Sequence, residues 1–164
     1  TMAMLLCLAA GCRTVKPVRF AVSPDVTDHA TITYHPAAVA GETHPIITRL
    51  ELSGSGHVLC QRGRSPRVQN AYWRKPGGQY WHDIVTDQVI LDPETTALYF
   101  QALVNAGLLD QRREAPAPED PTAAYVSIAG KIDGKTGFLA SNNPVLLDLY
   151  RSLRGRFKAA HPAK

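Results

Sequence analysis

His57 and Cys60 are the side chains whose chemistry suggests catalysis most directly, because an imidazole beside a thiol can produce a reactive thiolate. They are separated by an odd offset in HVLC, a stretch that is predicted to be a β-strand. Successive side chains of a strand point to opposite faces, so these two groups cannot meet. The neighbours His82 and Asp83 are excluded as a local pair for the same reason. A catalytic site would have to be assembled across the fold.

Residue types that bind metals or activate hydroxyl groups are dispersed along the chain. Ser55 lies in Gly54-Ser55-Gly56, which is typical of a turn and lacks the wider spacing of a nucleophile elbow. The six histidines form no H-x-H or H-x-x-x-H pair, and the sequence contains no CxxC motif. Nucleotide-binding glycine motifs are absent as well. We therefore expect no catalytic residues of recognisable type, no metal and no cofactor.

Cys12 follows an uncharged apolar stretch, residues 2–11. This stretch matches the roughly 7–15 residues of a secretory signal and is shorter than the ~20 residues of a membrane-spanning helix. The motif Leu8-Ala9-Ala10-Gly11-Cys12 resembles the lipobox of bacterial lipoproteins. The resemblance implies that residues 1–11 are a signal peptide, that a basic segment precedes them, and that Cys12 carries the lipid. The alternative is a buried apolar segment whose free cysteine follows a glycine.

Residues 12–29 are predicted to be an extended tether, because they contain prolines and little periodicity. Arg13 occupies the position where Asp favours the inner membrane in that lipoprotein family. The resemblance therefore implies export and anchoring in the outer membrane, facing the periplasm, in a cell with two membranes. Cys7 would leave with the signal peptide, so Cys60 would have no partner for an intramolecular disulfide.

Composition is typical of one globular domain, which we expect over residues 30–160. The chain has 164 residues, of which 45% are hydrophobic and 20% charged, and its formal net charge is +4. These values argue against intrinsic disorder. So small an excess of positive charge is explained by a solvated surface, and with no dense basic patch we expect no nucleic-acid partner.

Several elements are predicted from periodicity and turn chemistry. Two hairpins are expected at 46–62 and 123–141, further strands at 30–36 and 80–91, and amphipathic helices at 92–107 and 143–157. Asp92 and Asn143 each precede a proline and are the expected N-caps. We predict an α+β fold in which a small antiparallel sheet, built from the two hairpins, has two amphipathic helices packed on one face.

Two surfaces are candidates for ligand binding. The first is an aromatic and cationic loop whose side chains could stack on a sugar or hold an anionic group, formed by Tyr72, Trp73, Arg74, Lys75, Tyr80 and Trp81. Its alternative is a hairpin in which the aromatic residues cover the core. The second is the helix face of Arg151, Arg154 and Lys158, which could contact anionic lipid or polymer. Its alternative is complementation of the helix dipole.

The sequence thus predicts a lipid-anchored cell-envelope protein with a binding or structural role. Its expected partners are the membrane, through the lipid anchor, and peptidoglycan or an envelope protein. The alternative is a hydrolase or other enzyme that acts on an envelope substrate at a site assembled across the fold.

Overall fold

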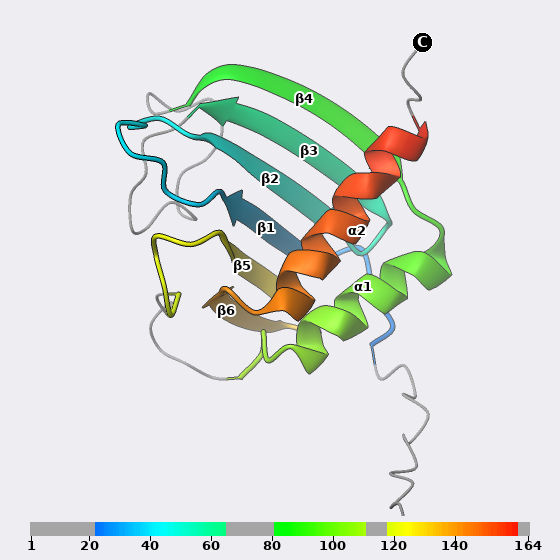
Figure 1. The fold of residues 1–164 in the computed structure, drawn as a ribbon. Coiled ribbons are helices and arrows are strands. Elements are labelled where there is room, and N and C mark those ends of the chain that lie inside the picture. Colours follow the sequence, from blue (N-terminus) through cyan, green and yellow to red (C-terminus); the bar gives the residue numbers. More distant parts are fainter. Residues whose placement is uncertain (1–21, 65–80, 111–117, 161–164) are drawn as a thin grey trace, which may run out of the picture.

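A computed structural model describes residues 22–64, 81–110 and 118–160 of the chain (Figure 1). Within these ranges it contains six strands and two helices. The elements in chain order are β1 (His29–His35), β2 (Ile46–Ser53), β3 (His57–Arg64), β4 (His82–Ile90), α1 (Pro93–Asn105), β5 (Tyr125–Ile132), β6 (Lys135–Ser141) and α2 (Pro144–Ala160).

The six strands form a single antiparallel sheet in the order β4-β3-β2-β1-β5-β6. The predicted fold class, an α+β fold with a small sheet of two hairpins and two helices, is therefore wrong. Strands account for more of the described chain than helices do, and the sheet dominates the architecture. The prediction failed because the hairpins are visible from local turn chemistry, whereas the strands that join them pair over long sequence distances.

β1 lies in the middle of the sheet and pairs with β2 on one side and with β5 on the other. Ile32 pairs with Leu50 of β2 on one side and with Ile128 of β5 on the other. The second hairpin, β5–β6, therefore extends the β2–β3–β4 meander instead of forming a layer of its own. All three of these side chains are buried, so one continuous apolar row crosses the sheet.

The predicted start and end of the first helix are confirmed. The Asp92 carboxylate accepts a hydrogen bond from the backbone N–H of Thr95 at 2.8 Å, and Pro93 occupies the first turn. Gly107 follows the C-cap with φ +90°, the left-handed conformation that glycine adopts at lowest cost.

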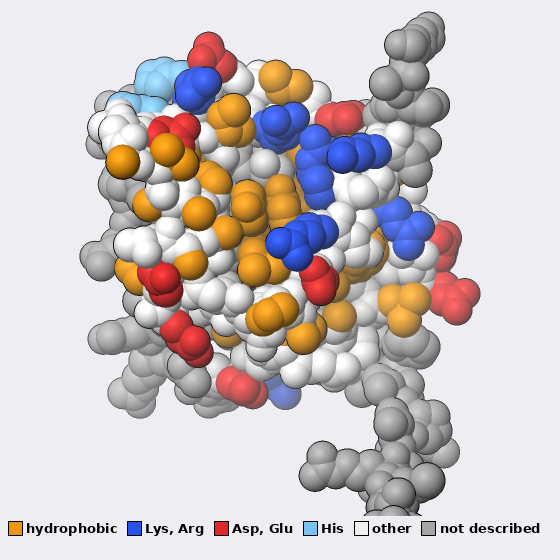
Figure 2. Space-filling model, in the orientation of Figure 1, with side chains coloured by type: hydrophobic (Ala, Val, Ile, Leu, Met, Phe, Trp, Pro, Cys, Tyr) orange, Lys and Arg blue, Asp and Glu red, His pale blue; other side chains and the backbone are white. Residues whose placement is uncertain are grey.

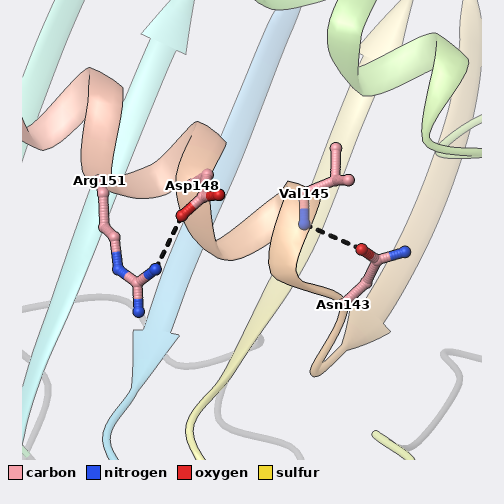
Figure 3. Close-up of polar contacts among 4 residues, drawn as sticks. All are labelled: Asn143, Val145, Asp148 and Arg151. Atoms are coloured by element: carbon pink, nitrogen blue, oxygen red, sulfur yellow. Dashed lines mark hydrogen bonds and ion pairs between the residues drawn. The ribbon is translucent and has the colours of Figure 1, made fainter.

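The second hairpin and second helix are also as predicted. Asp133 and Gly134 both have positive φ, 50° and 73°, as a tight hairpin turn with the sheet's own twist requires. Asn143 caps α2, because its side-chain oxygen accepts the N–H of Val145 at 2.9 Å (Figure 3). These features depend on neighbouring residues alone, which explains why the sequence shows them.

Both helices lie on one face of the sheet, with α2 crossing the strands diagonally and α1 beside it (Figure 1). The hydroxyl oxygens of Tyr99 in α1 and Ser152 in α2 lie 2.9 Å apart, so a hydrogen bond joins the two helices. The core lies between the helices and the sheet. Its fully buried large side chains include Ile32, Leu50, Leu52, Val58, Phe100, Leu103, Leu108, Ile128, Leu153 and Phe157.

The second face of the sheet is also buried at one end, where the chain leaves β1 and enters β2 and β5. The buried side chains there are both apolar and polar: Thr33, His35, Ile47, Trp81, Tyr125, Ser127 and Ala140. This end of the sheet therefore has apolar and polar groups enclosed on the face away from the helices.

Residues 22–28, which were predicted to belong to the tether, contact the opposite end of the sheet. Asp28 is only 3% exposed, and its carboxylate accepts the backbone N–H of Asp133 at 2.8 Å and that of Asp25 at 3.1 Å. Its carbonyl oxygen accepts the N–H of Gly54 at 2.7 Å. The segment therefore connects the turns of both hairpins before β1 begins.

Candidate binding site at the open end of the helix-bearing face

The structure separates His57 from Cys60, as the strand spacing predicts. Both residues lie in β3, but Cys60 is buried under the helices while His57 is exposed. Burial raises the pKa of the Cys60 thiol, with the positive charges of Arg154 and Arg62 opposing the increase and Asp87 adding to it. A raised pKa lowers the thiolate fraction, so Cys60 behaves as a core side chain.

Most of the sequence-predicted sites lie outside the described residues. These are the lipidation site Cys12 and, in the aromatic loop, Tyr72, Trp73, Arg74, Lys75 and Tyr80. Trp81 is described and is 6% exposed, so it is enclosed by the fold. A Cβ added to Gly63 would meet its ring at 3.0 Å, which places Trp81 directly against β3.

One serine–histidine pair is formed across the fold. The ring nitrogen Nε2 of His35 lies 3.1 Å from the hydroxyl oxygen of Ser127, and the His35 ring stacks on Tyr125 with 4.3 Å between ring centroids. His35 is 2% exposed and Ser127 is fully buried. The pair is enclosed by the fold, and the interaction is best explained as satisfaction of buried polar groups.

The two helices leave uncovered the part of the face that lies beside α2, away from α1 (Figure 1). Tyr34 of β1 stacks on Tyr150 of α2 with 4.6 Å between ring centroids and an interplanar angle of 5°. Burial raises the pKa of the Tyr150 hydroxyl, and a hydrogen bond with the side chain of Thr48 opposes the increase. Tyr150 is only 8% exposed, so the stacked pair packs α2 against β1.

Figure 2 shows cationic side chains above and to the right of a central apolar region on this face of the molecule. Arg151 is paired with Asp148 at 2.7 Å along α2 (Figure 3). Arg154 and Arg62 come from different elements, yet both positive charges act on Cys60. Arg62 lies two residues from Cys60 on β3, so it faces the side of the sheet that α2 covers.

A cavity of about 150 Å³ lies at the end of this face where β2 begins and β3 ends. We call it the basic pocket, and it is lined by Ile46, Arg62, Gly63, Arg64, Asp83 and Val85. Arg62 and Arg64 are both exposed, as are the apolar side chains of Ile46 at 43% and Val85 at 66%. The pocket thus combines two guanidinium groups with two apolar side chains and one carboxylate.

A β-bulge shapes this pocket. Arg62 pairs with Val85 whereas Arg64 pairs with His82, so β4 has one extra residue in this interval. The extra length is accommodated at Asp83, whose φ of 53° lies in the left-handed region that Asp tolerates better than most residues. The irregularity brings Asp83 into the lining of the pocket.

The sequence contains only a weak signal for this site. Arg62 and Arg64 alternate around Gly63, which places both on one face of a strand. The bulge that shifts β4 cannot be read from that spacing, and Ile46 and Val85 join the site only through pairing with β3. The sequence pattern therefore does not predict this site.

Within the described ranges, no group of three or more His, Cys, Asp or Glu side chains could hold a metal ion. Neither helix of this part of the chain is long and apolar enough to cross a membrane. Comparison with models of known protein families gives no match, and a search of curated protein sequences gives none either.

Proposed function

We propose that this protein is a lipid-anchored component of the bacterial cell envelope that binds another envelope component. The motif Leu8-Ala9-Ala10-Gly11-Cys12 is the observation that carries this proposal. In the lipoproteins that it resembles, the signal peptide is removed before the cysteine, which then carries the acyl chains. Stable anchoring needs more than one such chain. Arg13, by the same resemblance, directs the protein to the outer membrane of a two-membrane cell, facing the periplasm.

The arrangement of the domain supports a binding role. Residues 22–28, which continue the chain from Cys12, contact the hairpin-turn end of the sheet. The basic pocket lies at the other end, since Ile46 and Leu52 are at opposite ends of β2 and six residues of strand span about 20 Å. A domain attached at one end presents the other to a partner, for which peptidoglycan and envelope proteins are the candidates.

The alternative function, a hydrolase or other enzyme acting on an envelope substrate, gains no support from the described residues. Ser127 and His35 are in contact but are enclosed by the fold. Burial raises the pKa of the Cys60 thiol, which is the wrong direction for a nucleophile. Binding is therefore the function that we propose.

Intact mass measurement of the protein expressed in a bacterial host tests the anchor. We expect the wild-type chain to lose residues 1–11 and to gain the mass of acyl chains, and to fractionate with membranes. The Cys12→Ala variant should lose both the added mass and the membrane association. Cys7→Ala is the matched control, since a cysteine of the signal peptide should have no effect.

Two outcomes would contradict the proposal. The first is an uncleaved, unmodified wild-type chain in the soluble fraction. The second is acylation that persists in Cys12→Ala, which would place the lipid on another residue.

A further inference from the structure

We infer that the basic pocket binds the phosphate group of an amphiphile, that is, a phosphate ester with an apolar chain. This inference rests on the proposed function, which places the protein among the lipids and polymers of the cell envelope. The residues that form the site all lie in β2, β3 and β4.

The two arginines provide recognition of a phosphate. Arg62 and Arg64 are neighbours on one face of β3 and both line the cavity. Guanidinium groups form paired hydrogen bonds with phosphate oxygens, and a phosphate has enough oxygens to engage two of them at once. The Nη1 atom of Arg64 also donates to the carbonyl oxygen of His44 at 3.4 Å, which helps to hold the Arg64 side chain in place.

The charge balance favours an anion even though Asp83 is present. Asp83 can compensate only one of the two lining arginines. Two arginines against one aspartate leave the lining with one excess positive charge. A carboxylate ligand would repeat the contact that Asp83 can already make, whereas a phosphate brings a further negative charge and a third oxygen.

The apolar lining indicates what the phosphate is attached to. Val85 is 66% exposed and Ile46 is 43% exposed, and both border the same cavity as the arginines. A cavity of about 150 Å³ has room for roughly five water molecules, at about 30 Å³ each. This is enough for a phosphate group and the first part of a chain.

Isothermal titration with three probes tests the inference. The probes are octyl phosphate below its micelle concentration, inorganic phosphate, and octyl glucoside as the uncharged amphiphile. The protein is the full chain carrying Cys12→Ala, so that no acyl chain competes for the site. We expect octyl phosphate to bind, inorganic phosphate to bind more weakly, and octyl glucoside not to bind measurably.

Substitutions then assign the binding to this pocket. Arg62→Gln with Arg64→Gln should weaken octyl phosphate binding about tenfold or more, because charge-assisted contacts are lost. Val85→Ser should weaken octyl phosphate but leave inorganic phosphate unchanged. The matched control is Lys135→Gln with Arg156→Gln, which removes two exposed cations outside the pocket and should change neither affinity. Circular dichroism of each variant checks that the fold is retained.

Several results would overturn the inference. If octyl phosphate does not bind, the proposed ligand class is wrong. Octyl glucoside binding with equal affinity would show that charge plays no part in recognition, and inorganic phosphate binding as tightly as octyl phosphate would show the same for the apolar chain. Octyl phosphate binding that persists in the double arginine variant would show that the ligand binds outside the basic pocket.

Failure of this inference can be told apart from failure of the proposed function. The titrations use a chain that cannot be lipidated at Cys12, so they report on the pocket alone. The mass measurement reports on the anchor alone. An acylated protein whose pocket binds no amphiphile would keep the proposed function and refute only the ligand.

Discussion

Substitution of Gly63 by alanine tests the bulge that forms the basic pocket. An added Cβ would lie 2.9 Å from the carbonyl oxygen of His82 and 3.0 Å from Cε3 of Trp81. The oxygen belongs to the backbone of the neighbouring strand and Trp81 is 6% exposed, so neither group can move away freely. Gly63→Ala should therefore strain both the β3–β4 pairing and the packing of Trp81.

The magnitude follows from two opposing effects. Overpacking of this kind costs about 1–3 kcal/mol in the folded state. Replacing glycine also reduces the entropy of the unfolded chain, which stabilises by about 0.4–1 kcal/mol. We expect Gly63→Ala to lower the free energy of unfolding by about 1–2 kcal/mol. With a urea m-value of about 2 kcal/mol/M, the midpoint should fall by roughly 0.5–1 M.

The assay is equilibrium urea unfolding followed by far-ultraviolet circular dichroism. Gly155→Ala is the matched control, because a Cβ built at that position of α2 meets no atom within 4 Å apart from the adjoining residues and backbone of its own helix. Alanine is favoured over glycine in a helix by about 1 kcal/mol, so this variant should be more stable than the wild type. A Gly63→Ala midpoint equal to or above the wild-type midpoint would refute the packing described around the bulge.

Two further predictions concern ionisable groups. Hydrogen bonds from the side chain and the backbone N–H of Thr95 lower the pKa of Asp92 in the folded state. The ionised Asp92 therefore stabilises the fold fully at a pH above its pKa in the unfolded chain. This stabilisation is lost as the pH falls through the pKa of Asp92 in the folded state. Thermal unfolding should therefore show Asp92→Ala to be less stable than the wild type at neutral pH, with a difference that narrows in acid; a constant difference would contradict the pKa shift. Because burial raises the pKa of the Cys60 thiol, a chain with Cys7→Ser and Cys12→Ala should react with a thiol reagent much more slowly when native than in denaturant. Equal rates would show that Cys60 is accessible.

The local elements of this fold could be predicted because each depends on residues close together in the sequence. Asp92 caps α1 through a residue three positions later, and Asn143 caps α2 through a residue two positions later. The Asp133-Gly134 turn needs only two adjacent residues that tolerate positive φ. Side-chain and backbone chemistry within a few residues determines such features, whatever the rest of the chain does.

The arrangement of the sheet could not be predicted in this way. β1 is flanked by β2 and β5, and the pairing of Ile32 with Ile128 joins residues almost a hundred positions apart. No turn residue specifies which of two hairpins a lone strand joins, because that choice depends on burial over the whole face. The predicted fold therefore contained the right hairpins and helices in the wrong architecture.

The sequence by itself determined the lipobox-like motif at Cys12, the two hairpins, the two capped helices and the separation of His57 from Cys60, since each is a matter of residue type and short spacing. Only the tertiary structure decided that the strands make one sheet and that Arg62, Arg64, Ile46 and Val85 share a pocket. That pocket needs residues from three strands and a bulge that moves one strand relative to its neighbour. Pairing between distant segments, which maximises apolar burial across the whole sheet, brings them together.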